Sequence, residues 1–160
     1  MILGAGGAAK SIVTQAVLDG AKKVSIYVRP QSLVKAKENF RTLLDQTDCY
    51  LEFHDLTDAD HFQKELRQTD LLVNATSVGM DGESLPISID TSFPKELLVA
   101  DIIYQPFETP FLALARKQGI EAVNGLGMLL YQAAGAFKLW TGENMPTGAI
   151  WQELENIYNS

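Results

Sequence analysis

The sequence predicts an α/β protein with a doubly wound, mostly parallel sheet of about six strands and helices on both faces. Three observations support this class: short apolar runs alternate with amphipathic segments, a glycine-rich turn follows the first run, and no repeat or low-complexity linker interrupts the alternation. Strands that alternate with helices favour right-handed βαβ units, whose strands run parallel. With 160 residues, 46% of them apolar, the chain is expected to form one domain over residues 1–160.

The predicted strands are apolar runs that are short and partly continuous, as expected of strands covered on both faces. They lie at residues 1–3, 24–28, 50–53, 71–73, 98–103 and 120–123. Apolar residues at helical spacing predict helices over residues 8–19, 32–45, 58–67, 110–117, 126–141 and 147–158. The first strand is unusual because only Met1, Ile2 and Leu3 precede the glycines, where about five residues are typical.

Charge and composition exclude several classes of function. The formal net charge is −7, and the 20 acidic and 13 basic residues are scattered, so no basic stripe is available for nucleic acid. No apolar run approaches the roughly 20 residues of a membrane span, and the start lacks the pattern of a secretion signal. A single cysteine, Cys49, excludes an internal disulfide and is expected to be a small buried residue. We expect a cytoplasmic protein without nucleic-acid or membrane partners.

A phosphate-binding turn is predicted at Gly4, Ala5, Gly6, Gly7 and Ala8. Gly4 and Gly6 permit a tight turn and a close approach of the backbone to a pyrophosphate, and the small Ala9 lets the next helix pack close to its strand. The N-terminus of that helix offers free N–H groups and the positive end of its dipole. Because a strand precedes the turn and a helix follows it, we expect a dinucleotide bound to a Rossmann-type fold.

The end of the second predicted strand bears on the choice of cofactor. Sheets that bind NAD usually place Asp or Glu there, about 20 residues after the glycines, to accept the ribose hydroxyls. Here residues 27–31 read Tyr-Val-Arg-Pro-Gln and contain no acid. Arg29 can pair with a 2′-phosphate instead, and Lys35 can reach the same group. NADP is therefore expected, and NAD is the alternative if Arg29 is an ordinary solvated residue.

Polar side chains follow two further predicted strands. Asn74, Thr76 and Ser77 follow one of them, and Tyr104 follows the other. The carboxyl ends of strands line the ligand crevice of an open parallel sheet, so these residues are candidate ligand contacts. Local roles are an equal alternative, with Asn74 capping a turn and Asp101 holding a loop.

The last pattern opens a helix at Gly125 and Gly127. On this helix Met128 and Gln132 are four residues apart and share one face. Its large apolar residues are expected to be core rather than ligand contacts; they are Met128, Leu129, Tyr131, Phe137 and Trp140. Gln132 needs a polar partner, either backbone or a substrate hydroxyl.

Four motifs, "GAGGAAKS", "NATSVGM", "DIIYQPFETPF" and "GLGMLLYQAAGAFKLWTG", occur in this order and cover nearly the whole chain. Together they resemble the carboxy-terminal NADP-binding domain of the shikimate dehydrogenase family, including its quinate/shikimate dehydrogenase relatives. The resemblance implies cofactor contacts at Gly4, Ala5, Gly6, Gly7, Ala8, Arg29, Lys35, Thr76, Ser77, Ile102, Gly125 and Met128. It places Thr76 and Ser77 by the ribose and phosphates. It places Ile102, Gly125 and Met128 by the nicotinamide. Tyr104 and Gln132 match positions that contact the substrate.

Such enzymes are oxidoreductases that interconvert 3-dehydroshikimate and shikimate in aromatic amino-acid biosynthesis. Their catalytic Lys and Asp lie in an amino-terminal substrate domain that this chain does not contain, so we expect no catalytic or metal-binding residue here and no turnover by the chain alone. Met1 is expected to mark a truncation or a domain boundary inside the first strand. His54 and His61 are expected to be solvated surface residues.

Two departures from the family pattern leave alternatives open. Asn124 stands where the family usually has Asp, and Val28 stands where Asn often precedes the arginine. The alternatives are a quinate/shikimate dehydrogenase that uses NAD, and a stand-alone nucleotide-binding regulatory module. The oligomeric state, including a homodimer, is also open.

Overall fold

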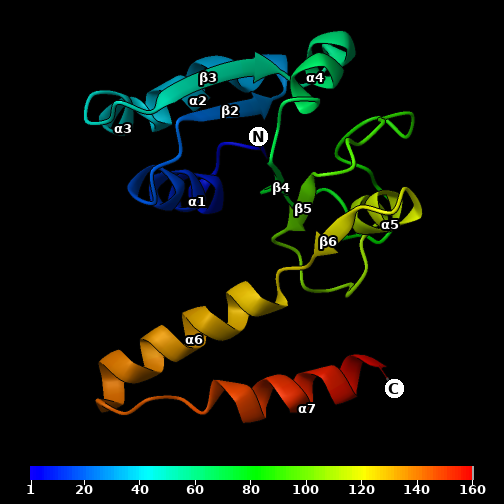
Figure 1. Cartoon of the computed structure of the whole chain (residues 1–160). Coiled ribbons are helices and arrows are strands. Elements are labelled where there is room, and N and C mark those ends of the chain that lie inside the picture. Colours follow the sequence, from blue (N-terminus) through cyan, green and yellow to red (C-terminus); the bar gives the residue numbers. More distant parts are fainter. Residues whose placement is uncertain (160) are drawn as a thin grey trace.

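In the computed structural model, which describes residues 1–159, six strands form one sheet and each strand runs parallel to its neighbours (Figure 1). The strands are β1 (Ile2–Leu3), β2 (Lys23–Val28), β3 (Tyr50–Asp55), β4 (Leu71–Asn74), β5 (Leu98–Asp101) and β6 (Glu121–Val123). Their spatial order is β3-β2-β1-β4-β5-β6. The order reverses between β1 and β4, which is where doubly wound sheets bind dinucleotides. The predicted Rossmann-type class is confirmed.

The helices are α1 (Gly7–Leu18), α2 (Leu33–Asn39), α3 (Arg41–Leu44), α4 (Ala59–Leu66), α5 (Pro110–Lys117), α6 (Leu126–Thr141) and α7 (Thr147–Asn159), with a 3₁₀ turn, η1, at Pro30–Ser32. The single helix predicted over residues 32–45 is wrong, because the chain leaves helical geometry at Phe40 (φ −99°, ψ 3°). The ring of Phe40 is fully buried and packs edge-on against Phe53. Burial of this ring outweighs continuation of the helix.

Two apolar layers cover the two faces of the sheet, and successive residues of each strand point into different layers. Ile2 packs with α1 and α2, whereas Leu3 packs with α4 and α5. The same alternation separates Ile26 from Tyr27. Cys49 is half-buried at the margin of the α1 and α2 layer and carries a free thiol, so the expectation of a fully buried residue is wrong.

A cavity of about 570 Å³ lies at the amino ends of β1, β2 and β4. β1 pairs with Ile26 and Tyr27 of β2, and the first half of β2 borders this cavity on that side. The ammonium of Met1 donates to the carbonyl of Leu71 at 2.7 Å beside this cavity, and burial lowers the pKa of the ammonium to about 6. This cavity is at the edge opposite the carboxyl ends of the strands.

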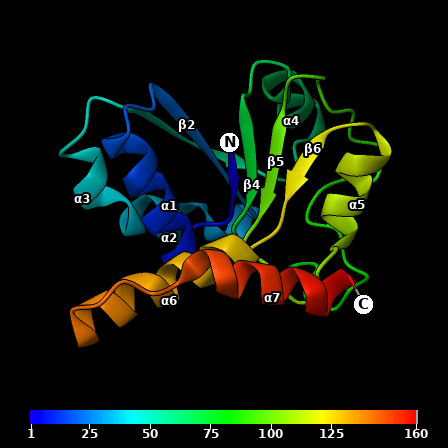
Figure 2. The ribbon, with the colours of Figure 1, turned by 60° about the horizontal axis from the view of Figure 1, so that its bottom comes forward.

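Helices α6 and α7 form a hairpin that crosses the carboxyl ends of the strands and extends beyond the sheet (Figure 2). The expectation that the large apolar residues of α6 are core is wrong: Met128 is only half-buried, and Leu129, Tyr131, Phe137 and Trp140 are exposed, Trp140 by 84%. The physical reason is that α6 packs against α7 along its outer part and meets no second layer there. No helix among the described residues is long and apolar enough to cross a membrane.

Candidate functional site

The glycine turn after β1 packs tightly against the loop that follows β4. Gly4 has a φ of +99°, and its N–H donates to the carbonyl of Tyr27 at 2.8 Å. A Cβ at Gly4 would lie 2.9 Å from Cγ2 of Thr76 and 3.0 Å from the carbonyl oxygen of Ala75. Both the backbone conformation and the lack of space therefore require glycine at this position.

The outer side of the same turn is open. Gly6, Gly7 and Ala8 are exposed, and a Cβ at either glycine would have no heavy atom within 4 Å. Gly6 is the N-cap of α1, which has no side-chain cap and no acidic residue in its first turn. The first N–H groups of this 12-residue helix therefore have no intrahelical acceptor and can bind an anion.

Asn39, at the end of α2, also contributes to the turn and was not among the predicted site residues. Its Nδ2 donates to the carbonyl of Ala5 at 3.1 Å. The two residues are 34 positions apart, so no local pattern could have revealed the contact. The bond connects α2, which carries Lys35, to the open glycine turn.

Arg29 lies directly after β2 and Lys35 lies on α2, as predicted, and both are exposed. In the sheet register, Asp55 of β3 is the acid paired with Val28, the last residue of β2. Its Oδ1 accepts from the N–H and the hydroxyl of Thr57 at 2.8 and 2.7 Å. That carboxylate therefore holds the turn before α4, whereas the residue that directly follows β2, Arg29, is basic.

Asn74 organises the loop after β4 and is completely buried. Its Oδ1 accepts from the N–H and the hydroxyl of Thr76 at 3.1 and 2.7 Å, and its Nδ2 donates to the carbonyl of Val78 and to Oδ1 of Asp101, both at 3.1 Å. The turn-capping interpretation of Asn74 is confirmed. The hydroxyl of Thr76 faces this network and its methyl faces Gly4, while Ser77 is exposed.

Asp101 holds the loop after β5, which is the local role predicted as the alternative to a ligand contact. Its Oδ1 accepts from the N–H of Ile103 at 3.0 Å and its Oδ2 from the hydroxyl of Thr109 at 2.8 Å, and Thr109 in turn caps α5. Burial raises the pKa of Asp101, although these hydrogen bonds oppose the shift. Because the carboxylate bonds Ile103, the strand ends at Asp101, and the predicted strand over residues 98–103 is two residues too long.

The junction between β6 and α6 rests directly on the loop after β5. The N–H of Gly125 donates to the carbonyl of Ile103 at 2.9 Å, and a Cβ at Gly125 would lie 1.9 Å from the carbonyl oxygen of Ile102. Asn124 reinforces this contact, since its Nδ2 donates to the carbonyl of Phe107 at 3.0 Å and its Oδ1 accepts from the N–H of Leu126 at 3.1 Å. An amide can make both bonds, whereas an ionised Asp could only accept.

The remaining predicted residues lie around this junction. Ile102 and Met128 are half-buried, beside Gly125. Tyr104 follows β5 and is 41% exposed, and Gln132 is on an exposed face of α6. The polar partner expected for Gln132, backbone or a substrate hydroxyl, stays a prediction, and its exposed side chain is accessible to a ligand.

His54 is not the solvated surface residue that was expected, whereas the side chain of His61 is 42% exposed. The side chain of His54 on β3 is 20% exposed, and its ring lies 4.4 Å, centroid to centroid, from that of His61 on α4. Both approach Glu65, whose carboxylate also binds Lys23 at 2.7 Å and Tyr27 at 2.5 Å. No local sequence pattern indicates this cluster, because its members come from β2, β3 and α4.

Glu65 is expected to contribute stability that acid removes. Burial raises its pKa, but hydrogen bonds from Lys23, Ser25 and Tyr27 outweigh burial and lower the pKa from 4.5 to about 2. The folded state therefore binds fewer protons than the unfolded state between these values, so the contribution is complete above pH 4.5 and is lost as the pH falls toward 2. The full shift converts to about 3 kcal/mol, and because solvent partly screens this carboxylate we expect it to account for about 2 kcal/mol of unfolding free energy over that range.

Urea unfolding at a series of pH values between 2.5 and 6 measures this effect. Glu65→Gln should flatten the acid limb relative to the unmodified chain, whereas Glu153→Gln, at an exposed position on α7, should leave it unchanged. An identical pH slope for Glu65→Gln and the unmodified chain would show that the carboxylate is not coupled to folding.

Comparisons with known proteins identify the relatives of this chain. The family description "Shikimate 5'-dehydrogenase C-terminal domain" matches residues 125–155. Over all 160 residues the chain is 99% identical to shikimate dehydrogenase (NADP(+)) of Streptococcus thermophilus, and it covers 56% of that protein. The chain spans about half the length of the curated relatives it matches.

Solved structures agree with the sequence matches. The shikimate 5-dehydrogenase of Listeria monocytogenes, in complex with shikimate and NAD, is 40% identical with a TM-score of 0.85, over 96% of this chain and 54% of that one. The shikimate 5-dehydrogenase of Thermus thermophilus, in complex with NADP(H) and shikimate, is 33% identical with a TM-score of 0.72, over 92% and 50%. By sequence and by fold, the chain is similar to shikimate dehydrogenases over about half of their length.

Proposed function

We propose that the chain is the NADP-binding part of an NADP-dependent shikimate dehydrogenase, which interconverts 3-dehydroshikimate and shikimate. The observation that carries the proposal is the cradle between β1 and β4: an open glycine turn, an uncapped N-terminus of α1, and two exposed cations after β2. Such a cradle offers backbone donors to a pyrophosphate and cationic side chains to a further phosphate. The Thermus relative, whose structure contains NADP(H) and shikimate, has the same fold.

Different residues of the cradle are proposed to bind different parts of the cofactor. The N–H groups of Gly7 and Ala8 donate to the pyrophosphate, with the positive end of the α1 dipole behind them. Arg29 pairs with the 2′-phosphate through its planar guanidinium, and Lys35 adds a second positive charge from α2. Ser77, exposed next to Thr76, offers a hydroxyl to the ribose or phosphates.

The nicotinamide end lies at the junction of β5, β6 and α6 in this proposal. Ile102, Gly125 and Met128 form an apolar wall, and the tight contact of Gly125 with the backbone of Ile102 keeps that wall at a fixed distance from β5. When bound, the nicotinamide supplies hydride transfer, and the protein contributes its orientation. Tyr104 and Gln132 are proposed to bind hydroxyl or carboxylate groups of the substrate.

The chain is proposed to hold the cofactor without turning over substrate by itself. Oxidation of a secondary alcohol needs a base for the hydroxyl proton, and the phenol of Tyr104 and the amide of Gln132 are hydrogen-bonding groups rather than bases near neutral pH. An amino-terminal substrate domain is the proposed source of the base and of the surface that excludes water. The proposed location of the complete enzyme is the cytoplasm.

Replacement of Arg29 tests the cofactor assignment. Arg29→Ala should weaken binding of NADP by about 1–3 kcal/mol, the contribution of a charge-assisted pair, and leave binding of NAD unchanged because NAD lacks the 2′-phosphate. Arg41→Ala is the matched control, since Arg41 is also exposed but lies on α3, beyond Asn39. Isothermal titration of the three proteins with both nucleotides measures the effect. Equal losses for NADP and NAD, or an equal loss in the control, would contradict the assignment.

A further inference from the structure

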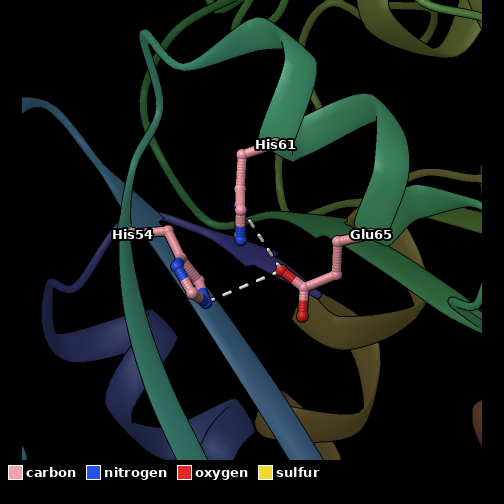
Figure 3. A group of neighbouring side chains, drawn as sticks. All are labelled: His54, His61 and Glu65. Atoms are coloured by element: carbon pink, nitrogen blue, oxygen red, sulfur yellow. Dashed lines mark ion pairs between the residues drawn. The ribbon is translucent and has the colours of Figure 1, made fainter.

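We propose that His54, His61 and Glu65 form a binding site for a divalent transition-metal ion such as Zn²⁺. The three side chains point toward one another from β3 and α4 (Figure 3). One donor atom from each of them lies within 4.8 Å of the other two. The cluster lies under α4, on the face of the sheet opposite α1, so it is separate from the proposed cofactor site and its test does not depend on NADP.

The backbone places the donors at a spacing close to that of a metal site. His61 and Glu65 are one turn apart on the same face of α4, and His54 approaches from β3. Nε2 of His54 lies 3.6 Å from Oε2 of Glu65. Ligand bonds of about 2.0–2.2 Å in tetrahedral geometry hold donor atoms roughly 3.3–3.6 Å apart. The His54–Glu65 pair therefore already has this spacing, and the remaining pairs, which lie within 4.8 Å, must close by up to about 1.5 Å around an ion.

The nitrogen of His54 provides an independent argument. Nε2 of His54 is buried and has no hydrogen-bond partner among the described residues, although it lies 3.5 Å from Oε2 of Glu52. A buried imidazole nitrogen without a partner is costly, because it loses the hydrogen bond that water would make. A metal ion at this position would use the lone pair of that nitrogen.

The surrounding residues orient the other two ligands. Lys23 and Ser25 bind Oε1 of Glu65, which leaves Oε2 directed toward the imidazoles. The hydroxyl of Tyr27 donates to Oε2 at 2.5 Å and lies 2.9 Å from Nδ1 of His61. With its own proton on Glu65, that hydroxyl accepts from Nδ1–H, so the lone pair of His61 is on Nε2.

The charge and type of the donors favour zinc-like ions over Mg²⁺ or Ca²⁺. Two imidazoles and one carboxylate are the ligands that Zn²⁺ uses in open sites, whereas Mg²⁺ and Ca²⁺ prefer oxygen only. The charged side chains that form ion pairs in the cluster are Lys23, Glu52 and Glu65, and their charges sum to −1 when both imidazoles are neutral. A divalent cation is therefore attracted, and it would join α4 to β3.

Zinc titration of the chain tests the proposal. His54 and His61 are the only two histidines in the sequence, so any imidazole signal reports this cluster. We expect binding of one Zn²⁺ per chain by calorimetry, weakened at least about tenfold in His54→Gln and in His61→Gln. Asp60→Asn, at an exposed position of α4, is the matched control and should bind like the unmodified chain. All proteins carry Cys49→Ser so that the free thiol contributes no metal binding.

Two further measurements make the result decisive. Zn²⁺ should raise the unfolding temperature of the control and not that of the histidine variants, and Mg²⁺ should have no effect. Because a histidine variant could fold poorly, NMR spectra of the imidazoles in the unsubstituted cluster should show both rings shifting together on addition of Zn²⁺. Any of three results would overturn the three-residue site. The folded control could fail to bind Zn²⁺, the histidine variants could bind it as tightly as the control, or Zn²⁺ could shift the signals of one imidazole ring alone.

Discussion

Gly125→Ala is expected to lower the free energy of unfolding by about 3 kcal/mol or more, because the added methyl group has no space. Its carbon would lie 1.9 Å from the carbonyl oxygen and 2.4 Å from the carbonyl carbon of Ile102. Both are backbone atoms, so no change of rotamer relieves the clash. The junction of β6 and α6 must then move away from β5, which breaks the 2.9 Å bond from Gly125 to Ile103.

The matched control is the same substitution elsewhere in α6. A Cβ at Gly135 would have no heavy atom within 4 Å, and this glycine lies in the helix interior. Gly135→Ala should therefore raise stability by about 0.5–1 kcal/mol, since alanine loses less backbone entropy in a helix. Urea unfolding followed by circular dichroism compares the two variants. If Gly125→Ala is within 0.5 kcal/mol of the unmodified chain, the tight contact with Ile102 is not a feature of the folded state.

Asn74→Ala is expected to lower the free energy of unfolding by about 3 kcal/mol, because it removes several buried hydrogen bonds at once. The amide of Asn74 binds Thr76, Val78 and Asp101. Alanine would leave the carbonyl of Val78 and the N–H of Thr76 without this partner. It would also remove a donor that opposes the raised pKa of Asp101.

Asn156→Ala, at an exposed position of α7, is the control for loss of an asparagine side chain and should change stability by less than about 0.5 kcal/mol. Chemical denaturation at pH 7 gives both values. Because Thr76 contacts Gly4, Asn74→Ala should also weaken nucleotide binding more than Asn156→Ala does. A similar small loss of stability in both variants would show that the Asn74 network is not cooperative.

The fold was largely predictable because its signals are local. The helix predicted over residues 110–117 coincides with α5, since Thr109 caps its start and Pro110 occupies its first turn. The helix predicted over residues 126–141 coincides with α6, which ends at the left-handed Gly142. The break at Phe40 carries no such signal, because it follows from burial of a ring against Phe53 on a distant strand.

The site was predictable only in part, because local sequence patterns do not record contacts between distant residues. Gly4, Arg29 and Gly125 occupy characteristic positions at strand ends, so pattern and resemblance indicated them. The bonds that position them join residues far apart, such as Asn39 to Ala5 and Asn124 to Phe107. The His54 cluster likewise depends on the pairing of β3 with β2 and the docking of α4. No single stretch of sequence records such contacts.

The ratio of NADP to NAD affinity of the unmodified chain tests the central claim most directly. If the exposed Arg29 and Lys35 bind the 2′-phosphate, calorimetric titration at a fixed, moderate ionic strength should give one site per chain, with NADP bound roughly tenfold or more tightly than NAD. The difference should shrink as salt is added, because the distinguishing contact is between exposed charges. Equal affinity for the two nucleotides, or a failure of the folded chain to bind either one, would contradict the account.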